Sequence, residues 1–225
     1  MTDKETPASS NDDETTRAQT TTEALEWHAP VMVRIDEHTT IPHLFKERVQ
    51  RGATRPLILR KIGIGDTWRS ITARDFYDEV QSVAAGLIAR GLEPGDRVAI
   101  MSRTRYEWTL LDFACWAAAL VPVPIYETSS IDQVAHVLVD ADVNLIVTET
   151  VSMAEIVRAA AEREHRDNTH VLSLDSEAIE TLIAEGATVP RDRVAARADK
   201  LTTDDIATIV YTSGTTGTPK GTVLS

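Results

Sequence analysis

The sequence has little of what disulfide-stabilised or membrane-spanning proteins need. Its 225 residues include one cysteine, Cys115, so an intrachain disulfide is excluded. The longest apolar run, residues 113–125, is interrupted by Pro122 and Pro124 and is shorter than the about 20 residues that a membrane-spanning helix requires. The first residues are polar and acidic, which predicts no signal peptide. We therefore expect a cytoplasmic protein, with peripheral contact to a membrane left open.

Positive charge is also scarce. The chain has 23 Lys and Arg against 35 Asp and Glu, which gives a net charge of −12. Proteins that neutralise nucleic-acid phosphates over a broad surface carry the opposite balance, so we exclude nucleic acid as a partner. The acidic balance does not exclude a bound nucleotide, because a local nest of backbone N–H groups can hold phosphate within an acidic protein.

Composition divides the chain into two parts. Residues 1–26 are rich in Thr, Ser, Asp and Glu and nearly lack large apolar side chains. Such a segment cannot bury enough surface to offset its ordering entropy, so it is interpreted as a disordered acidic tail. Residues 27–225 are interpreted as one domain. Its first elements are predicted as a strand at 31–35, a helix at 41–49, and a hairpin formed by 57–62 and 67–71.

From Thr72 onward, strands and helices are predicted to alternate. Strands are expected at 97–101, 121–125, 143–147, 170–174 and 206–211. The intervening helices are predicted to start at Thr72 with Asp75, at Thr104 with Glu107, at Ser130 with Gln133, and near 153 and 176, with a connector at 187–205. Alternation of this kind implies an α/β fold with a mainly parallel sheet and helices on both faces.

The segment 211–221, Tyr-Thr-Ser-Gly-Thr-Thr-Gly-Thr-Pro-Lys-Gly, has the composition of a polyanion cradle. It follows a predicted strand, and ligands of open α/β sheets bind beyond the carboxyl ends of strands. Its glycines let the backbone approach a ligand, and its hydroxyls can donate to phosphate oxygens. Lys220 adds a mobile positive charge, while Pro219 stiffens the chain before it.

Other interpretations of this segment fit less well. A flexible Thr/Ser/Gly linker would not be expected to follow a strongly strand-forming run or to contain a proline and a lone lysine. A Walker loop has glycine directly before its lysine and Ser or Thr directly after it, whereas Pro219 and Gly221 flank Lys220 here. Gly214 and Gly217 also lack the first glycine pair of a dinucleotide fingerprint.

The segment resembles the signature loop of the adenylate-forming (AMP-binding) superfamily, which includes acyl-CoA synthetases, peptide-synthetase adenylation domains and luciferases. Residues 95–100, Gly-Asp-Arg-Val-Ala-Ile, and the helix after them are also similar to this family. The run 121–130, Val-Pro-Val-Pro-Ile-Tyr-Glu-Thr-Ser-Ser, looks most like bacterial long-chain fatty acid–CoA ligases. The resemblance covers about residues 41–225 and implies an N-terminal AMP-binding domain.

The resemblance implies a two-step reaction. A fatty acid carboxylate attacks the α-phosphate of ATP, with Mg²⁺, to give an acyl-adenylate and pyrophosphate; the thiol of coenzyme A, a co-substrate, then displaces AMP. No catalytic or metal-binding residue is assigned within this chain. By position, the residues that would hold the β- and γ-phosphates are Thr212, Ser213, Gly214, Thr215, Thr216 and Lys220.

Family elements for adenine, Mg²⁺ and ribose, and a lysine on a small mobile lid domain, would follow Ser225. We therefore expect an incomplete N-terminal domain that does not catalyse the full reaction alone. Two alternatives stay open: another acyl- or aryl-CoA ligase or peptide-synthetase adenylation domain, and a non-catalytic nucleotide-binding fragment. Oligomeric state is not predicted.

A few single residues invite functional interpretations. The six histidines show no spacing typical of metal ligands. Cys115, in an apolar run, is interpreted as a buried structural thiol. Trp68, Trp108 and Trp116 are expected to anchor the core, and Tyr126 is a weaker candidate for a substrate pocket.

Overall fold

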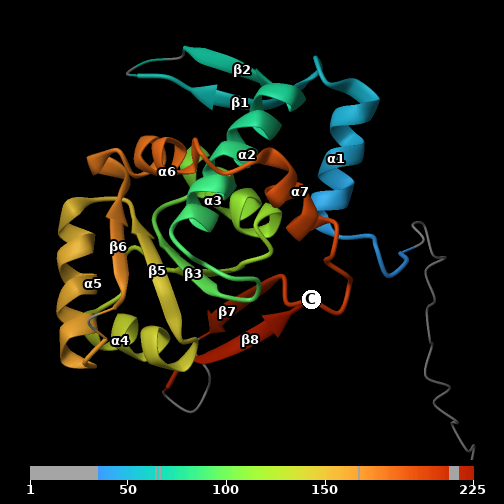
Figure 1. Ribbon diagram of the computed structural model, residues 1–225. Coiled ribbons are helices and arrows are strands. Elements are labelled where there is room, and N and C mark those ends of the chain that lie inside the picture. Colours follow the sequence, from blue (N-terminus) through green and yellow to red (C-terminus); the bar gives the residue numbers. More distant parts are fainter. Residues whose placement is uncertain (1–34, 64, 66, 167, 213–217) are drawn as a thin grey trace, which may run out of the picture. The chain divides into compact units, whose positions relative to one another are not determined.

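The computed structural model describes residues 35–63, 65, 67–166, 168–212 and 218–225 (Figure 1). The tail predicted for 1–26 and most of the strand predicted for 31–35 lie outside the described residues. Ile35, the last residue of that predicted strand, belongs to no helix or strand. The helices and strands described below all belong to the unit from Ile35 to Ser225.

A four-stranded parallel sheet lies at the centre of this unit. Its strands run side by side in the order β4 (Val121–Ile125), β3 (Arg97–Met101), β5 (Val143–Thr148) and β6 (His170–Ser173). Every neighbouring pair is parallel, and most of their residues are buried, which explains the continuous apolar runs in the sequence. The predicted α/β fold is confirmed.

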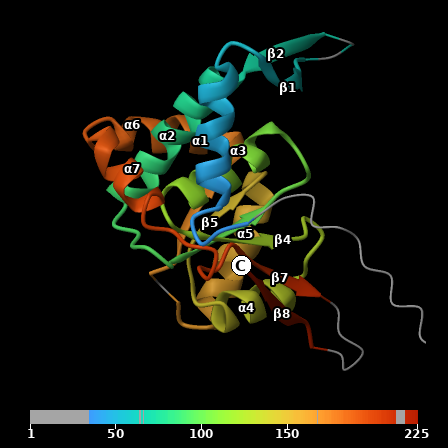
Figure 2. The same ribbon diagram turned by 90° about the vertical axis from the view of Figure 1, so that its right-hand side faces the viewer.

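Helices cover both faces of this sheet, as predicted (Figures 1 and 2). One core packs α2 (Ala73–Ala89), α3 (Tyr106–Ala117) and α6 (Ala178–Gly186) against side chains such as Ile100 and Val147. The other packs α4 (Ile131–Asp140) and α5 (Val151–Arg163) against Met101 and Ile146. A short 3₁₀ turn, Leu174–Ser176, precedes α6. In the described ranges, no helix combines the length and apolarity needed to cross a bilayer.

Two helix starts, at Thr72 and Ser130, were predicted correctly, whereas the helix predicted to start near 153 starts at Val151 behind the capping side chain of Thr150. The Thr72 hydroxyl accepts a hydrogen bond from the Asp75 N–H at 3.1 Å, and Ser130 and Gln133 form a complete capping box. The start predicted at Thr104 is wrong, since α3 follows Arg105 without a side-chain cap. The Glu107 carboxylate is not available for capping because Arg105 and Arg60 bind it.

The first elements also match the prediction. Helix α1 spans Ile41–Gly52, and strands β1 (Pro56–Lys61) and β2 (Trp68–Thr72) form an antiparallel hairpin. Ile71 is buried against the body of the domain, whereas the Trp68 side chain is 57% exposed. The expectation that Trp68 anchors the core is therefore wrong, because its strand position places it on the outer face. Trp108 is half-buried and packs against the core, and the ring of the half-buried Trp116 contacts the Phe113 ring, with centroids 5.2 Å apart.

The connector predicted for 187–205 contains a helix, α7 (Arg191–Ala198). Only Val194 in this helix is buried, so the sequence shows no apolar periodicity there. Arg197 holds the helix in place instead: its guanidinium donates to the Leu92 carbonyl at 2.7 Å and pairs with Glu93 at 3.0 Å. A polar anchor of this kind cannot be recognised from hydrophobic spacing.

The strand predicted at 206–211 is present, but it does not join the parallel sheet as expected. β7 (Thr208–Thr212) forms an antiparallel ribbon with β8 (Lys220–Leu224) and is not part of the four-stranded sheet. Pro122 and Pro124 lack an N–H at alternate positions of the edge strand β4, and β3 pairs with β4 along its length. The two positions without a backbone N–H therefore lie on the outer edge of β4. There β7 is held by the Thr208 hydroxyl, which donates a hydrogen bond to the Pro122 carbonyl at 2.9 Å.

Helix α3 buries two ionisable side chains in its apolar surroundings. Cys115 is fully buried, as predicted, and burial raises the pKa of its thiol well above the usual value. Asp112 is 9% exposed, and burial raises the pKa of its carboxyl to about 7. A carboxyl group in this setting is favoured in its neutral form.

Asp112→Asn is expected to stabilise the fold above neutral pH. The unfolded Asp112 ionises near the ordinary pKa of 3.8 and the folded one near 7, so its ionisation costs stability progressively between these values. The variant cannot ionise, and its advantage in free energy of unfolding should grow by about 2 kcal/mol between pH 5 and pH 8. Urea denaturation at both pH values measures this; an advantage that does not depend on pH would contradict it.

Candidate phosphate-binding site

Thr212 and Lys220 form a cross-strand pair where β7 ends and β8 begins. Both are exposed, and residues directly opposite in an antiparallel ribbon point to the same face. The segment 213–219, which connects the two strands, starts from one of them and ends at the other. The Thr212 hydroxyl and the Lys220 ammonium group therefore lie side by side at the two ends of the glycine- and hydroxyl-rich segment.

Helix α4 fixes the base of this hairpin. The Tyr211 hydroxyl donates to the Asp140 carboxylate at 2.6 Å, and His136 Nε2 donates to the Pro219 carbonyl at 2.8 Å. The Tyr211 and His136 rings also meet edge to face, with centroids 5.8 Å apart. Burial, together with the nearby Asp140, raises the pKa of Tyr211. His136 and Asp140 are four residues apart on one helix, so a single rigid face of α4 holds both strands.

Gly221 allows the two strands to approach closely behind Lys220. A Cβ at this position would lie 2.9 Å from Ile209 Cγ2 and 3.1 Å from Tyr211 Cζ. Any larger residue would push β8 away from Tyr211 and displace the pair formed by Thr212 and Lys220. This glycine therefore serves strand contact in addition to loop geometry.

Of the six residues predicted to bind phosphate, the structure brings two together, Thr212 and Lys220. The other four, Ser213, Gly214, Thr215 and Thr216, lie outside the described residues. Tyr126, the weaker pocket candidate, is 72% exposed.

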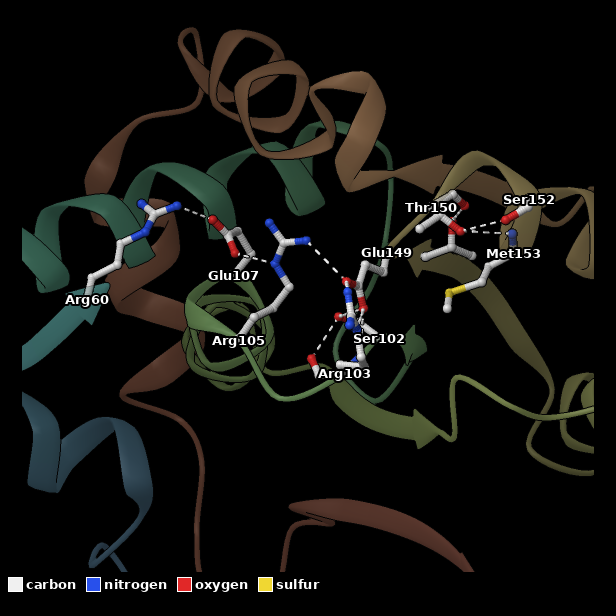
Figure 3. Close-up of polar contacts among 10 residues, drawn as sticks. Arg60, Ser102, Arg103, Arg105, Glu107, Glu149, Thr150, Ser152 and Met153 are labelled. Atoms are coloured by element: carbon white, nitrogen blue, oxygen red, sulfur yellow. Dashed lines mark hydrogen bonds and ion pairs between the residues drawn. The ribbon is translucent and has the colours of Figure 1, made fainter. Parts of the chain in front are cut away.

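A second polar cluster, which sequence analysis missed, lies at the carboxyl edge of the sheet (Figure 3). The strand order is β4, β3, β5, β6, so the chain passes from β3 to β4 on one side of the sheet and from β5 to β6 on the other. The direction of the connections therefore reverses between β3 and β5. Ser102 and Arg103 follow β3, and Glu149 follows β5, so all three meet at this switch point. Open α/β sheets bind ligands at such positions.

Glu149 is the centre of this cluster. Its carboxylate is 5% exposed, accepts the Arg103 backbone N–H at 2.9 Å, and pairs with the Arg103 guanidinium at 2.6 Å. The hydrogen bond from the Arg103 side chain is the main reason why the pKa of Glu149 is lowered to about 2. The Arg105 guanidinium lies 3.6 Å from the same carboxylate and also binds Glu107 at 2.6 Å. Alternating charges thus tie the loop after β3 to the start of α3.

The sequence contained a weak signal for this cluster. Charged residues lie two positions after the ends of two predicted strands, Arg103 after 97–101 and Glu149 after 143–147. Sequence alone does not give the strand order, so it could not show that these two strand ends are neighbours. The pairing became visible only with the sheet topology.

The ion pair predicts a pH-dependent contribution to stability. The unfolded Glu149 ionises near the ordinary pKa of 4.5 and the folded one near 2, so the stabilisation is complete above 4.5 and is lost as pH falls through 2. Glu149→Gln should lower the free energy of unfolding at pH 7, and its deficit should shrink by about 2 kcal/mol between pH 7 and pH 3. Urea denaturation at the two pH values tests this, and a deficit of constant size would rule it out.

Comparison with known proteins agrees with this geometry. The family model described as "AMP-binding enzyme" matches residues 45–225, a range that includes the β7–β8 hairpin and the polar cluster around Glu149. The chain belongs to the AMP-binding enzyme family.

Two curated relatives of this AMP-binding chain are both named long-chain-fatty-acid–CoA ligases. It is 36% identical over 202 residues to the long-chain-fatty-acid–CoA ligase FadD15 of Mycobacterium bovis, covering 89% of this chain and 33% of that protein. It is 28% identical over 213 residues to the long-chain-fatty-acid–CoA ligase ACSBG2 of Rattus norvegicus, covering 87% and 31%. The chain spans about a third of the length of these relatives.

Several solved structures share the fold. The crystal structure of VinN matches with a TM-score of 0.68 at 20% identity, covering 84% of this chain and 44% of that one. A Mycobacterium tuberculosis fatty acyl CoA synthetase matches with a TM-score of 0.66 at 24% identity, covering 82% and 34%. At these identities the likeness shows that the α/β fold is shared and shows nothing about substrate.

Proposed function

We propose that the complete protein activates a long-chain fatty acid with ATP and transfers the acyl group to coenzyme A. The observation that carries this proposal is the Thr212–Lys220 pair at the neck of a glycine- and hydroxyl-rich segment, in a chain of the AMP-binding family. The names of the curated relatives support a long-chain acyl substrate.

In the proposed first step, a carboxylate oxygen of the fatty acid attacks the α-phosphorus of ATP. The bond between the α-phosphorus and the bridging oxygen breaks, which releases pyrophosphate and leaves the acyl-adenylate. Negative charge grows on the departing pyrophosphate, and donors that are already in place stabilise it most. The Lys220 ammonium and Thr212 hydroxyl would supply two such donors, and Ser213, Gly214, Thr215 and Thr216 would complete the set.

In the proposed second step, the thiol of coenzyme A attacks the acyl carbon, and AMP leaves. None of the residues that the structure describes is assigned to coenzyme A. Mg²⁺ bound with ATP would offset the negative charge of the phosphates. Among the described residues, no group of three or more His, Cys, Asp or Glu side chains is arranged to hold a metal ion.

Product analysis of the complete protein tests this proposal. Incubation with ATP, Mg²⁺, coenzyme A and fatty acids of increasing chain length should give AMP, pyrophosphate and acyl-CoA in equal amounts, with the highest rates for long chains. A preference for acetate, aryl acids or amino acids would reject the long-chain substrate. Formation of ADP, or AMP formation that does not depend on any acid, would reject the reaction itself.

A further inference from the structure

The β1–β2 hairpin exposes a group of large apolar side chains. We call the outer side of this hairpin, formed by Leu57, Leu59 and Trp68, the hairpin surface. The exposed fractions of these three residues are 37%, 64% and 57%. In Figures 1 and 2 the hairpin lies at one end of the domain, apart from the four-stranded sheet. Apolar residues grouped in this way mark an interaction site more often than isolated ones do.

Strand register explains why these side chains face outward. Ile58 pairs with Ile71, which is buried, so this pair faces the body of the domain. Leu59 is one position from Ile58 and Trp68 is three positions from Ile71, so both side chains point to the opposite face. The inner face packs against the core of the domain through Ile58 and Ile71.

Positive charge is concentrated around this surface. Residues 51–71 contain five Lys and Arg and one Asp, whereas the whole chain has a net charge of −12. Arg51 and Arg60 pair with Glu47 and Glu107. Arg55 and Arg69 are exposed. The hairpin surface therefore combines an apolar face with a basic surrounding on an otherwise acidic molecule.

A cleft adjoins the hairpin surface on the side of α3. Its volume is about 580 Å³, and Trp68 and Leu59 line it together with Arg60 and Arg105. Glu107, the one carboxylate in its lining, is already bound by both of these arginines. The cleft therefore offers two guanidinium groups beside an apolar wall, which suits an anionic headgroup next to an acyl chain.

The chemistry of this region favours a lipid surface over a second protein. Trp and aliphatic side chains insert at the boundary between headgroups and acyl chains, while Lys and Arg are attracted to anionic lipids. A second copy of this chain, paired through the same surface, would bring two basic regions together, which is repulsive. We infer that the β1–β2 hairpin docks on an anionic lipid bilayer through Leu57, Leu59 and Trp68. This inference does not depend on which acid the protein activates.

Vesicle binding by the complete protein, without ATP or fatty acid, tests the inference. The probes are vesicles of phosphatidylcholine with phosphatidylglycerol, and vesicles of phosphatidylcholine alone. The protein should sediment with the first kind and much less with the second. The double substitution Leu59→Ser and Trp68→Ser should weaken binding at least about tenfold, because it removes two inserting side chains. Val139→Ser is the matched control, since Val139 is 49% exposed but lies on α4.

Each outcome decides for or against the hairpin surface. Loss of binding in the double variant, with binding kept in Val139→Ser, supports the inference. Equal binding by all three proteins, or equal binding to both kinds of vesicle, overturns it. A change in oligomeric state without any change in vesicle binding also overturns it, and would assign the surface to a protein interface. Fatty acid activation is not measured, so failure of the proposed reaction would leave this result unaffected.

Discussion

Replacing Gly86 by alanine is expected to lower the free energy of unfolding by about 3 kcal/mol or more. Helices α2 and α6 cross at this residue, and an added Cβ would lie 2.0 Å from the Leu182 carbonyl oxygen and 2.6 Å from its carbon. These are backbone atoms, so the two helices would have to separate. Alanine favours a helix over glycine by about 1 kcal/mol, which is too little to offset the separation.

Gly52→Ala provides the matched control for this prediction. Gly52 is also a helical glycine, at the end of α1, but a Cβ there would meet only the side chains of Arg55 and Arg48. These flexible groups can move away, so Gly52→Ala should change stability little. Urea denaturation of both variants measures the difference. If Gly86→Ala were as stable as Gly52→Ala, the close crossing of α2 and α6 would be refuted.

Replacing Lys220 by alanine is expected to slow acyl-adenylate formation in the complete protein by about 10²–10³-fold. The ammonium group would contact the β- and γ-phosphates, where charge grows as pyrophosphate departs. Its loss should therefore lower the rate of the chemical step more than the affinity for the fatty acid. Single-turnover measurement of acyl-adenylate, with fatty acid and Mg-ATP at saturation, isolates this step.

Lys200→Ala is the control for the loss of a lysine, because Lys200 is exposed and follows α7, away from the β7–β8 ribbon. It should retain the parent rate. Lys220→Arg keeps the charge and should recover part of the activity. Equal rates for Lys220→Ala and the parent protein would remove Lys220 from the proposed site.

The general architecture could be predicted from the sequence because local signals and buried packing agree there. Apolar strands buried on both faces and amphipathic helices gave the parallel sheet with two helical layers. Side-chain caps at Thr72 and Ser130 fixed two helix starts correctly. The start predicted at Thr104 failed because Glu107 binds Arg60, which is distant in sequence, and Arg105, which directly precedes the helix.

Features that depend on tertiary contacts were not predictable. Helix α7 is held by Arg197 and one buried residue, Val194, so it lacks the periodicity that identifies a helix. The ribbon of β7 and β8 stays outside the main sheet because of the prolines in β4, a consequence that requires the strand order. The close crossing at Gly86 likewise requires knowing which helices are neighbours.

The candidate site was predictable in part for the same reason. Residue chemistry identified Lys220 and the hydroxyl-rich segment before it. It did not indicate that Tyr211 and Pro219 are fixed by α4, or that Gly221 lets the strands close behind Lys220. The cluster of Arg103 and Glu149 was missed because its members are brought together only by the reversal of strand order.

Labelling of lysines in the complete protein tests the central claim most directly, which is that the β7–β8 hairpin contacts the β- and γ-phosphates of ATP. An amine-reactive acetylating reagent is applied with no ligand, with Mg-ATP, with pyrophosphate or with AMP, and mass spectrometry gives the labelling rate of each lysine. Mg-ATP and pyrophosphate should each slow labelling of Lys220 several-fold, AMP should not, and Lys200 should be unaffected. Labelling of Lys220 at the same rate in all four samples would contradict the account.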